Sequence, residues 1–233
     1  MRRSMTGHLQ ESLPLDVFGQ MALDEALAKS KPDAFCLRFF RWRGVGATFG
    51  YAQRIREVTR ALPAGVGDSF TRRPTGGGIV PHVDDLTFSC VFPDGGVLRP
   101  AEIYRRLHTA VLAGLRAAGL EAQLCAQGGG AAPRGPGGAS QCFIQPVALD
   151  ILSEEGKILG GAIRRCGTTV LYQGSLQLPD ARKRAAELEA AISQALAAGW
   201  GLEWERRELE KSVRAEASAL EAKYRSAEWI RRR

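Results

Sequence analysis

Three segments of the chain carry apolar residues at the spacing of an α-helix. Residues 15–29 mix apolar side chains with Ala, Glu and Lys, while residues 100–119 and about 181–198 repeat an apolar side chain every four positions. This period places the apolar side chains on one face of a helix. The clearest repeats are Ile103, Leu107, Val111 and Leu115 behind Pro100, and Leu188, Ile192 and Leu196. The pattern predicts three helices, and we expect the final segment from residue 220 to begin as a fourth.

Shorter apolar and aromatic runs predict strands between these helices. Turn-forming clusters such as Pro93–Gly96 separate them. The runs are 34–43, 47–53, 67–78 (a strand that leads into a glycine-rich turn), 86–92, 146–152, 157–163 and 168–178. Helices that interrupt groups of antiparallel-looking strands are typical of α+β proteins rather than of a doubly wound sheet. The stretch 127–140 holds six glycines and two prolines, so we predict a loop there.

The composition suits a protein with a buried core and no membrane span. The chain has 233 residues, 45% of them hydrophobic, which allows one large domain or two small ones. No apolar run approaches the roughly 18 residues that a membrane helix needs, and the first residues lack the apolar stretch of a secretory signal. The five cysteines show neither metal spacing nor an even count. We therefore predict a cytoplasmic protein without disulfides, in which Cys36 and Cys90 are core residues.

The formal net charge of +7 favours acidic partners. The basic residues are spread over the chain, and no basic strip interleaved with aromatic residues appears. We expect no nucleic-acid partner and no membrane partner.

Two glycine-containing motifs are candidates for substrate binding. RRPTGGG (72–78) brings three consecutive glycines, which let a backbone approach a ligand closely, behind two arginines that favour anions. It is not a phosphate-binding P-loop, and a plain turn between strands is the alternative. In GKILGGAIRR (156–165), Lys157 could donate to a carbonyl or a developing oxyanion at the edge of a pocket. A solvated lysine in a hairpin is the alternative.

Two further candidates are a cysteine and a histidine. Cys142 follows the predicted loop, and a nearby cation would lower its pKa and raise its reactivity. A partly buried, inert cysteine is the alternative. His82 lies beside Asp84 and Asp85, but no HxH or HExxH spacing accompanies it. We expect a structural hydrogen-bonding role for His82 rather than metal binding.

The order of the motifs resembles the biotin/lipoate A/B protein ligase superfamily. MALDEAL (21–27), FFRWRGVGATFGYAQ (39–53) and RRPTGGGIVPHVDDLTFS (72–89) are similar to the first half of lipoate–protein ligases and octanoyltransferases. QCFIQPVALDILSEEGKILGGAIRR (141–165) and LYQGSLQL (171–178) are similar to the second half, and AKYRSAEW (222–229) to the closing segment. The resemblance covers the chain from about residue 15. It implies one catalytic domain over 1–233, with a central mixed or antiparallel sheet flanked by helices and no C-terminal accessory domain.

The resemblance also implies the residues of the site. In the family, the glycine-rich turn lines the acyl pocket, and the lysine of the GK motif contacts the acyl carbonyl. The matching positions for substrate binding are Arg73, Thr75, Gly76, Gly77, Gly78, His82, Gly161, Ala162, Gln173, Gly174 and Ser175. The implied catalytic residues are Cys142 and Lys157. We expect no metal ion in the site.

Two activities of this family remain open. GYAQ, HVDDLTFS and the position of Cys142 resemble octanoyltransferases, which pass an acyl group through an enzyme cysteine without ATP. Gly78 is typical of ligases, which use ATP and magnesium to make lipoyl-AMP, and Ile163-Arg164-Arg165 replaces a more usual Gln-containing sequence. The implied partners are octanoyl-acyl carrier protein and a lipoyl domain or glycine-cleavage H-type carrier protein. A catalytically silent acyl-binding member is a further alternative, and a biotin protein ligase fits the glycine-rich turn poorly.

Overall fold

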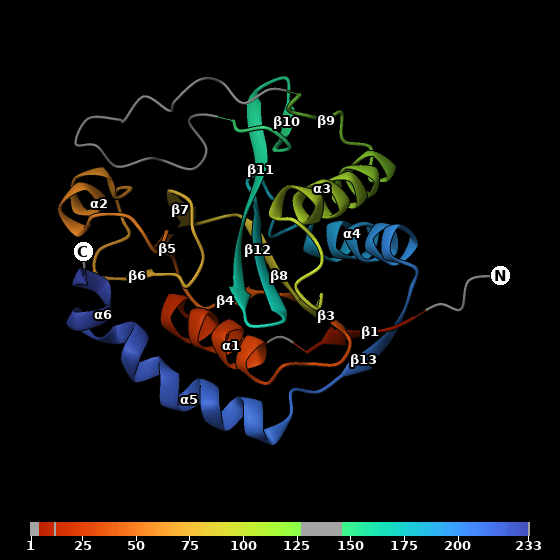
Figure 1. Ribbon diagram of the computed structural model, residues 1–233. Helices are drawn as coiled ribbons and strands as arrows, with labels where there is room; N and C mark the ends of the chain where they lie inside the picture. Colours follow the sequence, from red (N-terminus) through yellow and green to blue (C-terminus); the bar gives the residue numbers. More distant parts are fainter. Residues whose placement is uncertain (1–4, 12, 127–145, 233) are drawn as a thin grey trace.

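The frame of the protein is an eight-stranded mixed sheet (Figure 1). The computed structural model describes residues 5–11, 13–126 and 146–232. The strand order is β13-β1-β3-β8-β12-β11-β10-β9, in which β1 runs parallel to β13 and β3, and the other neighbours pair antiparallel. In sheet order the strands are Leu202–Arg207, Met5–Gln10, Phe35–Phe39, Leu86–Pro93, Thr169–Leu176, Gly156–Cys166, Ile151–Ser153 and Gln123–Leu124.

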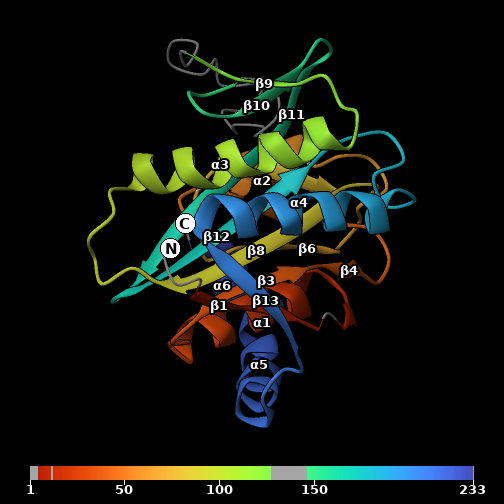
Figure 2. The same ribbon diagram turned by 90° about the vertical axis from the view of Figure 1, so that its right-hand side faces the viewer.

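Two pairs of helices cover the two faces of this sheet. α3 (Pro100–Ala117) and α4 (Ala185–Trp200) pack side by side on one face (Figure 2). α1 (Val17–Lys29) lies against the other face, and α5 (Lys211–Arg225) packs on α1. Because α1 lies between the sheet and α5, most of its residues are buried. The side chain of Asp16 caps its first turn by accepting a hydrogen bond from the amide of Gly19 (3.0 Å).

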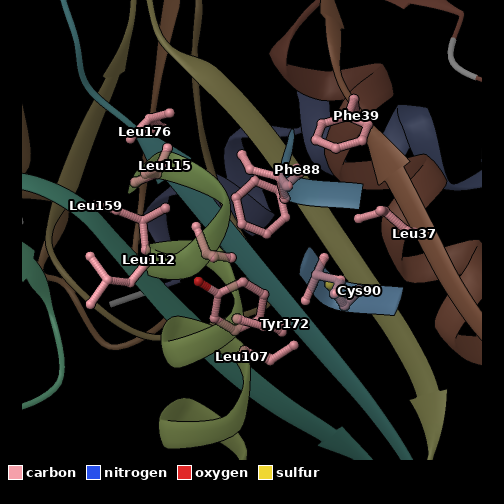
Figure 3. Packing of buried hydrophobic residues seen from close by; sticks show 14 of the residues in the cluster. Leu37, Phe39, Phe88, Cys90, Leu107, Leu112, Leu115, Leu159, Tyr172 and Leu176 are labelled. Carbon is pink, nitrogen blue, oxygen red and sulfur yellow. The ribbon is translucent and has the colours of Figure 1, made fainter. Parts of the chain in front are cut away.

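The main hydrophobic core lies between the sheet and the α3–α4 pair. Leu107, Leu112 and Leu115 of α3 meet Phe88 of β8 and Tyr172 of β12 (Figure 3). The apolar side chains that recur every four residues in α3 and every two residues in the strands point into this layer. The two periods therefore build one continuous core.

A smaller three-stranded sheet stands beside the large one. Its order is β6-β5-β7, with bounds Phe70–Arg72, Gly46–Phe49 and Ile79–His82. α2 (Ile55–Ala61) packs on it, and so does Ile230 of α6 (Ala227–Arg231). A two-stranded ribbon of β2 (Pro14–Leu15) and β4 (Arg41–Trp42) completes the fold. The buried Arg72 donates to the carbonyl oxygens of Tyr51, Gln53, Trp229 and Ile230.

The predicted helices are all present, with shifted ends. α4 begins at residue 185 and continues to Trp200, where Gly201 adopts a left-handed conformation (φ 66°) and ends the helix. The prediction of a strand over 146–152 is wrong for its first part, because 147–150 forms a turn and only Ile151–Ser153 pairs as β10. The sequence reasoning missed β1, β2, β7, β9, β13, α2 and α6. The predicted loop at 127–140 lies outside the described residues.

Candidate active site

A pocket lies between the large sheet, the small sheet and α1. β11 and β12 form one wall, and β5, β7 and the turn before β7 face them. The lining residues expected from the sequence are Arg73, His82, Gly161, Ala162, Gln173, Gly174 and Ser175. The lining residues that sequence reasoning missed are Met21, Thr48, Val80, Thr87 and Gly160. The pocket thus combines residues from five separate segments of the chain.

The pleat of β11 and β12 determines which side chains reach the pocket. Ala162 pairs with Gln173, and Gly160 pairs with Ser175. Tyr172, the residue before Gln173, points into the core on the opposite face. Gly161, opposite Gly174, has no side chain, and a Cβ there would overlap the Tyr172 ring. Gly161 therefore serves the packing of the core as well as the pocket wall.

The glycine-rich turn is held against the small sheet by close backbone contacts. A Cβ on Gly50 would overlap the carbonyl oxygen of Gly77, and the amide of Tyr51 donates to the carbonyl of Thr75 (2.8 Å). Arg73 donates to the carbonyl of Gly76 (2.6 Å from Nη2). Gly77 has a φ of +88°, which disfavours any other residue. Gly78, the last residue of the turn, is buried. Arg72 and Arg73, the two arginines of this motif, both donate hydrogen bonds to backbone carbonyl oxygens.

Gln173 joins the turn, the large sheet and α1 in one buried network. Its Oε1 accepts from the hydroxyl of Thr75 (2.6 Å), and its Nε2 donates to Asp24 Oδ2 (2.7 Å). Asp24 also forms a buried ion pair with Arg38 and accepts from the hydroxyl of Ser89 (2.7 Å). Because both ends of the amide are engaged, the orientation of Gln173 at the pocket wall is defined.

A second buried network surrounds His82. Its Nδ1 lies 2.8 Å from Asp85 Oδ2, and its Nε2 lies 2.9 Å from the Thr48 hydroxyl. Asp85 also accepts from Thr87 and from Ser175 (2.8 Å). Burial alone would raise the pKa of Asp85, but His82 and the two hydroxyl donors outweigh it and hold this pKa below its usual value. Both ring nitrogens of His82 are thus engaged in hydrogen bonds, while His82 also lines the pocket.

Lys157 is not among the lining residues, but the end of its side chain lies beside one of them, Gly160. Its Nζ is 2.8 Å from Asp150 Oδ2, and the two side chains are only 3% and 4% exposed. The end of the side chain lies against Gly160, where an added Cβ would be 2.6 Å from Nζ. The predicted alternative of a solvated lysine is therefore wrong. The absence of a side chain at Gly160 brings the ammonium to the wall of the pocket.

Two of the described cysteines are buried in the core. Cys142 lies outside the described residues. Burial raises the pKa of the Cys36 thiol to about 11 and that of Cys90 well above its usual value. Both are core residues, as predicted. Cys125 and Cys166 are of intermediate exposure.

In the part of the chain that the structure describes, no group of three or more His, Cys, Asp or Glu residues is arranged to hold a metal ion. Within the same residues, every helix is too short or too polar to cross a membrane.

Known structures share this architecture. A lipoate-protein ligase A bound with ATP superimposes with a TM-score of 0.76 at 24% identity, over 97% of this chain and 99% of that one. The bi-partite lipoate protein ligase of Thermoplasma acidophilum, described with its E2 lipoyl domain, gives 0.72 at 21% identity, over 97% and 96%. These likenesses establish an α+β fold of the lipoate ligase type, as predicted.

Sequence comparison identifies the family. The model of the lipoyl protein ligase A/B catalytic domain matches residues 16–215, so this chain belongs to that family. Among curated proteins, the octanoyltransferase LipM of Moorella thermoacetica is 27% identical over 266 aligned residues, which cover 94% of this chain and 95% of LipM. The family expected from the motifs is therefore confirmed.

Proposed function

We propose that this protein transfers an octanoyl or lipoyl group to a lysine of a lipoyl carrier domain, through a thioester on Cys142. The observation that carries the proposal is the pocket between the two sheets, with the ammonium of Lys157 beside the lining residue Gly160. Similarity to an octanoyltransferase over nearly the whole chain supports acyl transfer rather than another chemistry of this fold.

The reaction proceeds in two steps. The Cys142 thiolate attacks the carbonyl carbon of the carrier thioester, a new C–S bond forms, and the carrier thiolate leaves and takes up a proton. The neutral amine of the acceptor lysine then attacks the acyl-enzyme. An amide forms, the enzyme thioester breaks, and the proton of the amine returns to the Cys142 sulfur. No nucleotide is consumed, so this reaction requires no cofactor.

Lys157 stabilises the charge that develops on the acyl oxygen. An ammonium held against Gly160 can donate to the carbonyl and to the tetrahedral oxyanion, and one such donor is commonly worth roughly 3 kcal/mol of transition-state stabilisation. The acyl chain then occupies the pocket between β11–β12 and the small sheet. Each buried methylene contributes about 0.8 kcal/mol, so the depth of the pocket selects chain length.

The partners follow from the reaction and from charge. Octanoyl-acyl carrier protein is the donor, and a lipoyl domain or the H-type carrier protein of glycine cleavage is the acceptor. The formal net charge of +7 assists the encounter with acidic carriers. These partners are expected in the cytoplasm.

An ATP-dependent lipoate–protein ligase is the second candidate. The third glycine of the turn, Gly78, is typical of ligases, and one structure of similar fold is a lipoate-protein ligase bound with ATP. In that reaction ATP and magnesium are required to make lipoyl-AMP. A catalytically silent acyl-binding protein is the third candidate.

Intact-mass analysis after incubation with octanoyl-carrier protein, without ATP, separates these candidates. We expect an octanoyl adduct on the wild type and on the matched control Cys166→Ala, and none on Cys142→Ala. An adduct that persists on Cys142→Ala would refute the role of Cys142. If no adduct forms and lipoylation requires ATP and free lipoate, the protein is a ligase. Stable acyl binding without any transfer would identify a silent member.

A further inference from the structure

The ion pair between Lys157 and Asp150 is almost completely buried. Their charged atoms are 2.8 Å apart, and their side chains are 3% and 4% exposed. Removing two charges from water offsets most of the attraction between them, so a buried pair of this kind contributes little net stability. The position of the pair, beside the lining residue Gly160 of the candidate active site, indicates a role in orienting the lysine.

The direction of the lysine side chain depends on this carboxylate. Lys157 is at the start of β11, and its chain folds along the strand until Cε and Nζ lie 2.5 and 2.6 Å from the ideal Cβ position of Gly160. Asp150 Oδ1 is 3.6 Å from the same point. The ammonium is thus held between a carboxylate and the bare backbone of a residue that lines the pocket.

A strained turn places the carboxylate. Leu149 has a φ of +75°, a conformation that residues other than glycine rarely adopt. Asp150 Oδ2 accepts from the amide of Val147 (2.7 Å), and the backbone of Cys125 bonds to both Leu149 and Asp150. Surrounding contacts must compensate for the cost of this conformation.

One of these contacts comes from the opposite side of the sheet. His108 of α3 lies 2.6 Å from the carbonyl oxygen of Leu149 through Nδ1, and 2.8 Å from the Tyr172 hydroxyl through Nε2. Because a carbonyl only accepts, Nδ1 carries the proton, and Nε2 accepts from Tyr172. Burial lowers the pKa of His108, which favours this neutral form. Tyr172 is itself fixed among the leucines of the core (Figure 3).

We infer that Asp150 is the positioning residue of Lys157, and that His108 holds the turn that carries Asp150. The chain of contacts runs from the core through Tyr172, His108 and the Leu149 carbonyl to the ammonium at the pocket wall. This inference rests on the proposed function, which assigns the acyl carbonyl to Lys157.

A double-mutant cycle with Asp150→Asn and Lys157→Met tests it. We expect Asp150→Asn to lower kcat for octanoyl transfer by about 10- to 100-fold, with less than a threefold change in KM, and Asp150→Glu to recover part of the loss. In the Lys157→Met background, Asp150→Asn should have no further effect, because the residue that it orients is gone. His108→Gln should show a smaller loss of the same kind.

Asp94→Asn is the matched control. Asp94 is a buried carboxylate that pairs with Arg165 of the same strand β11 (2.7 Å) but is not part of the pocket. We expect its kcat to equal that of the wild type. A loss in Asp94→Asn as large as that in Asp150→Asn would show that any broken ion pair on β11 has this effect, and would overturn the inference.

Failure of the inference and failure of the proposed function give different results. If Lys157→Met retains full activity, the role proposed for the lysine is wrong. If Lys157→Met loses most of its activity but Asp150→Asn keeps the wild-type kcat, the positioning role is wrong. It is also wrong if Asp150→Asn lowers the residual activity of Lys157→Met by the same factor as it lowers the activity of the wild type.

Should Asp150→Asn not fold, amine acetylation of the folded Asp150→Glu, followed by mass spectrometry, replaces the cycle. We expect faster modification at Lys157 than in the wild type, and an unchanged rate would overturn the inference.

Discussion

Replacement of Gly160 by alanine should strongly lower activity while leaving the fold intact. The added methyl group would lie 2.5 Å from Lys157 Cε and 2.6 Å from Nζ. Because carbon atoms in contact are about 3.5–4 Å apart, the end of the lysine must move by roughly 1 Å. A displacement of this size at a reacting group costs on the order of 100-fold in rate. We therefore expect kcat for octanoyl transfer to fall about 100-fold.

The same substitution should leave stability nearly unchanged. The atoms that obstruct the methyl group are the end of a flexible side chain, and alanine is favoured over glycine within a strand by roughly 0.5–1 kcal/mol. Gly161→Ala is the matched comparison, since its methyl group would overlap the Tyr172 ring in the packed core. Overpacking of this kind costs about 1–3 kcal/mol. Urea denaturation should thus separate the two variants.

Chain-length dependence provides the decisive control for Gly160→Ala. If the methyl group merely narrowed the pocket, the loss would be large for an octanoyl donor and small for a butyryl donor. Lys157 acts at the carbonyl group, which both donors share. Its displacement should therefore lower kcat with both donors by the same factor. Full activity, or a loss confined to long chains, would refute the reasoning.

Three further predictions concern stability. Arg72→Lys should lower the free energy of unfolding by about 3 kcal/mol in urea denaturation, because lysine cannot donate to all four backbone carbonyls that the guanidinium bonds; a loss below 1 kcal/mol would contradict this. The pKa of Asp85 is lowered in the folded protein, so its stabilising contribution is complete above the unfolded value near 3.8 and is lost as the pH falls through the lower folded value. The difference in unfolding free energy between wild type and Asp85→Asn should therefore shrink below pH ~4, and a constant difference would argue against the pairing with His82. Gln173→Leu should cost about 1–3 kcal/mol in thermal unfolding, because Asp24 loses a buried donor, whereas an unchanged melting temperature would mean that this hydrogen bond is dispensable.

The contributions of sequence and structure are clearest where local pattern and long-range packing differ. The four-residue repeat in α3 predicted a helix because its buried side chains face a single layer, the sheet. β13 escaped prediction because its sequence, LEWERR, is mostly charged and exposed, and only its pairing with β1 makes it a strand. The turn at 147–150 also escaped, because contacts from Cys125 and His108 hold Leu149 in its left-handed conformation.

The sequence alone determined the family and the class of fold, and through the family resemblance it indicated seven of the twelve residues that line the pocket. It could not assign Asp24, Asp85 or Asp150, since a carboxylate in a sequence has no visible partner. Gln173 reaches Asp24 and Ser175 reaches Asp85 from distant positions in the chain, and Lys157 meets Asp150 only because the turn before β10 and the start of β11 fold together. The burial that makes these contacts strong is likewise a property of the folded chain.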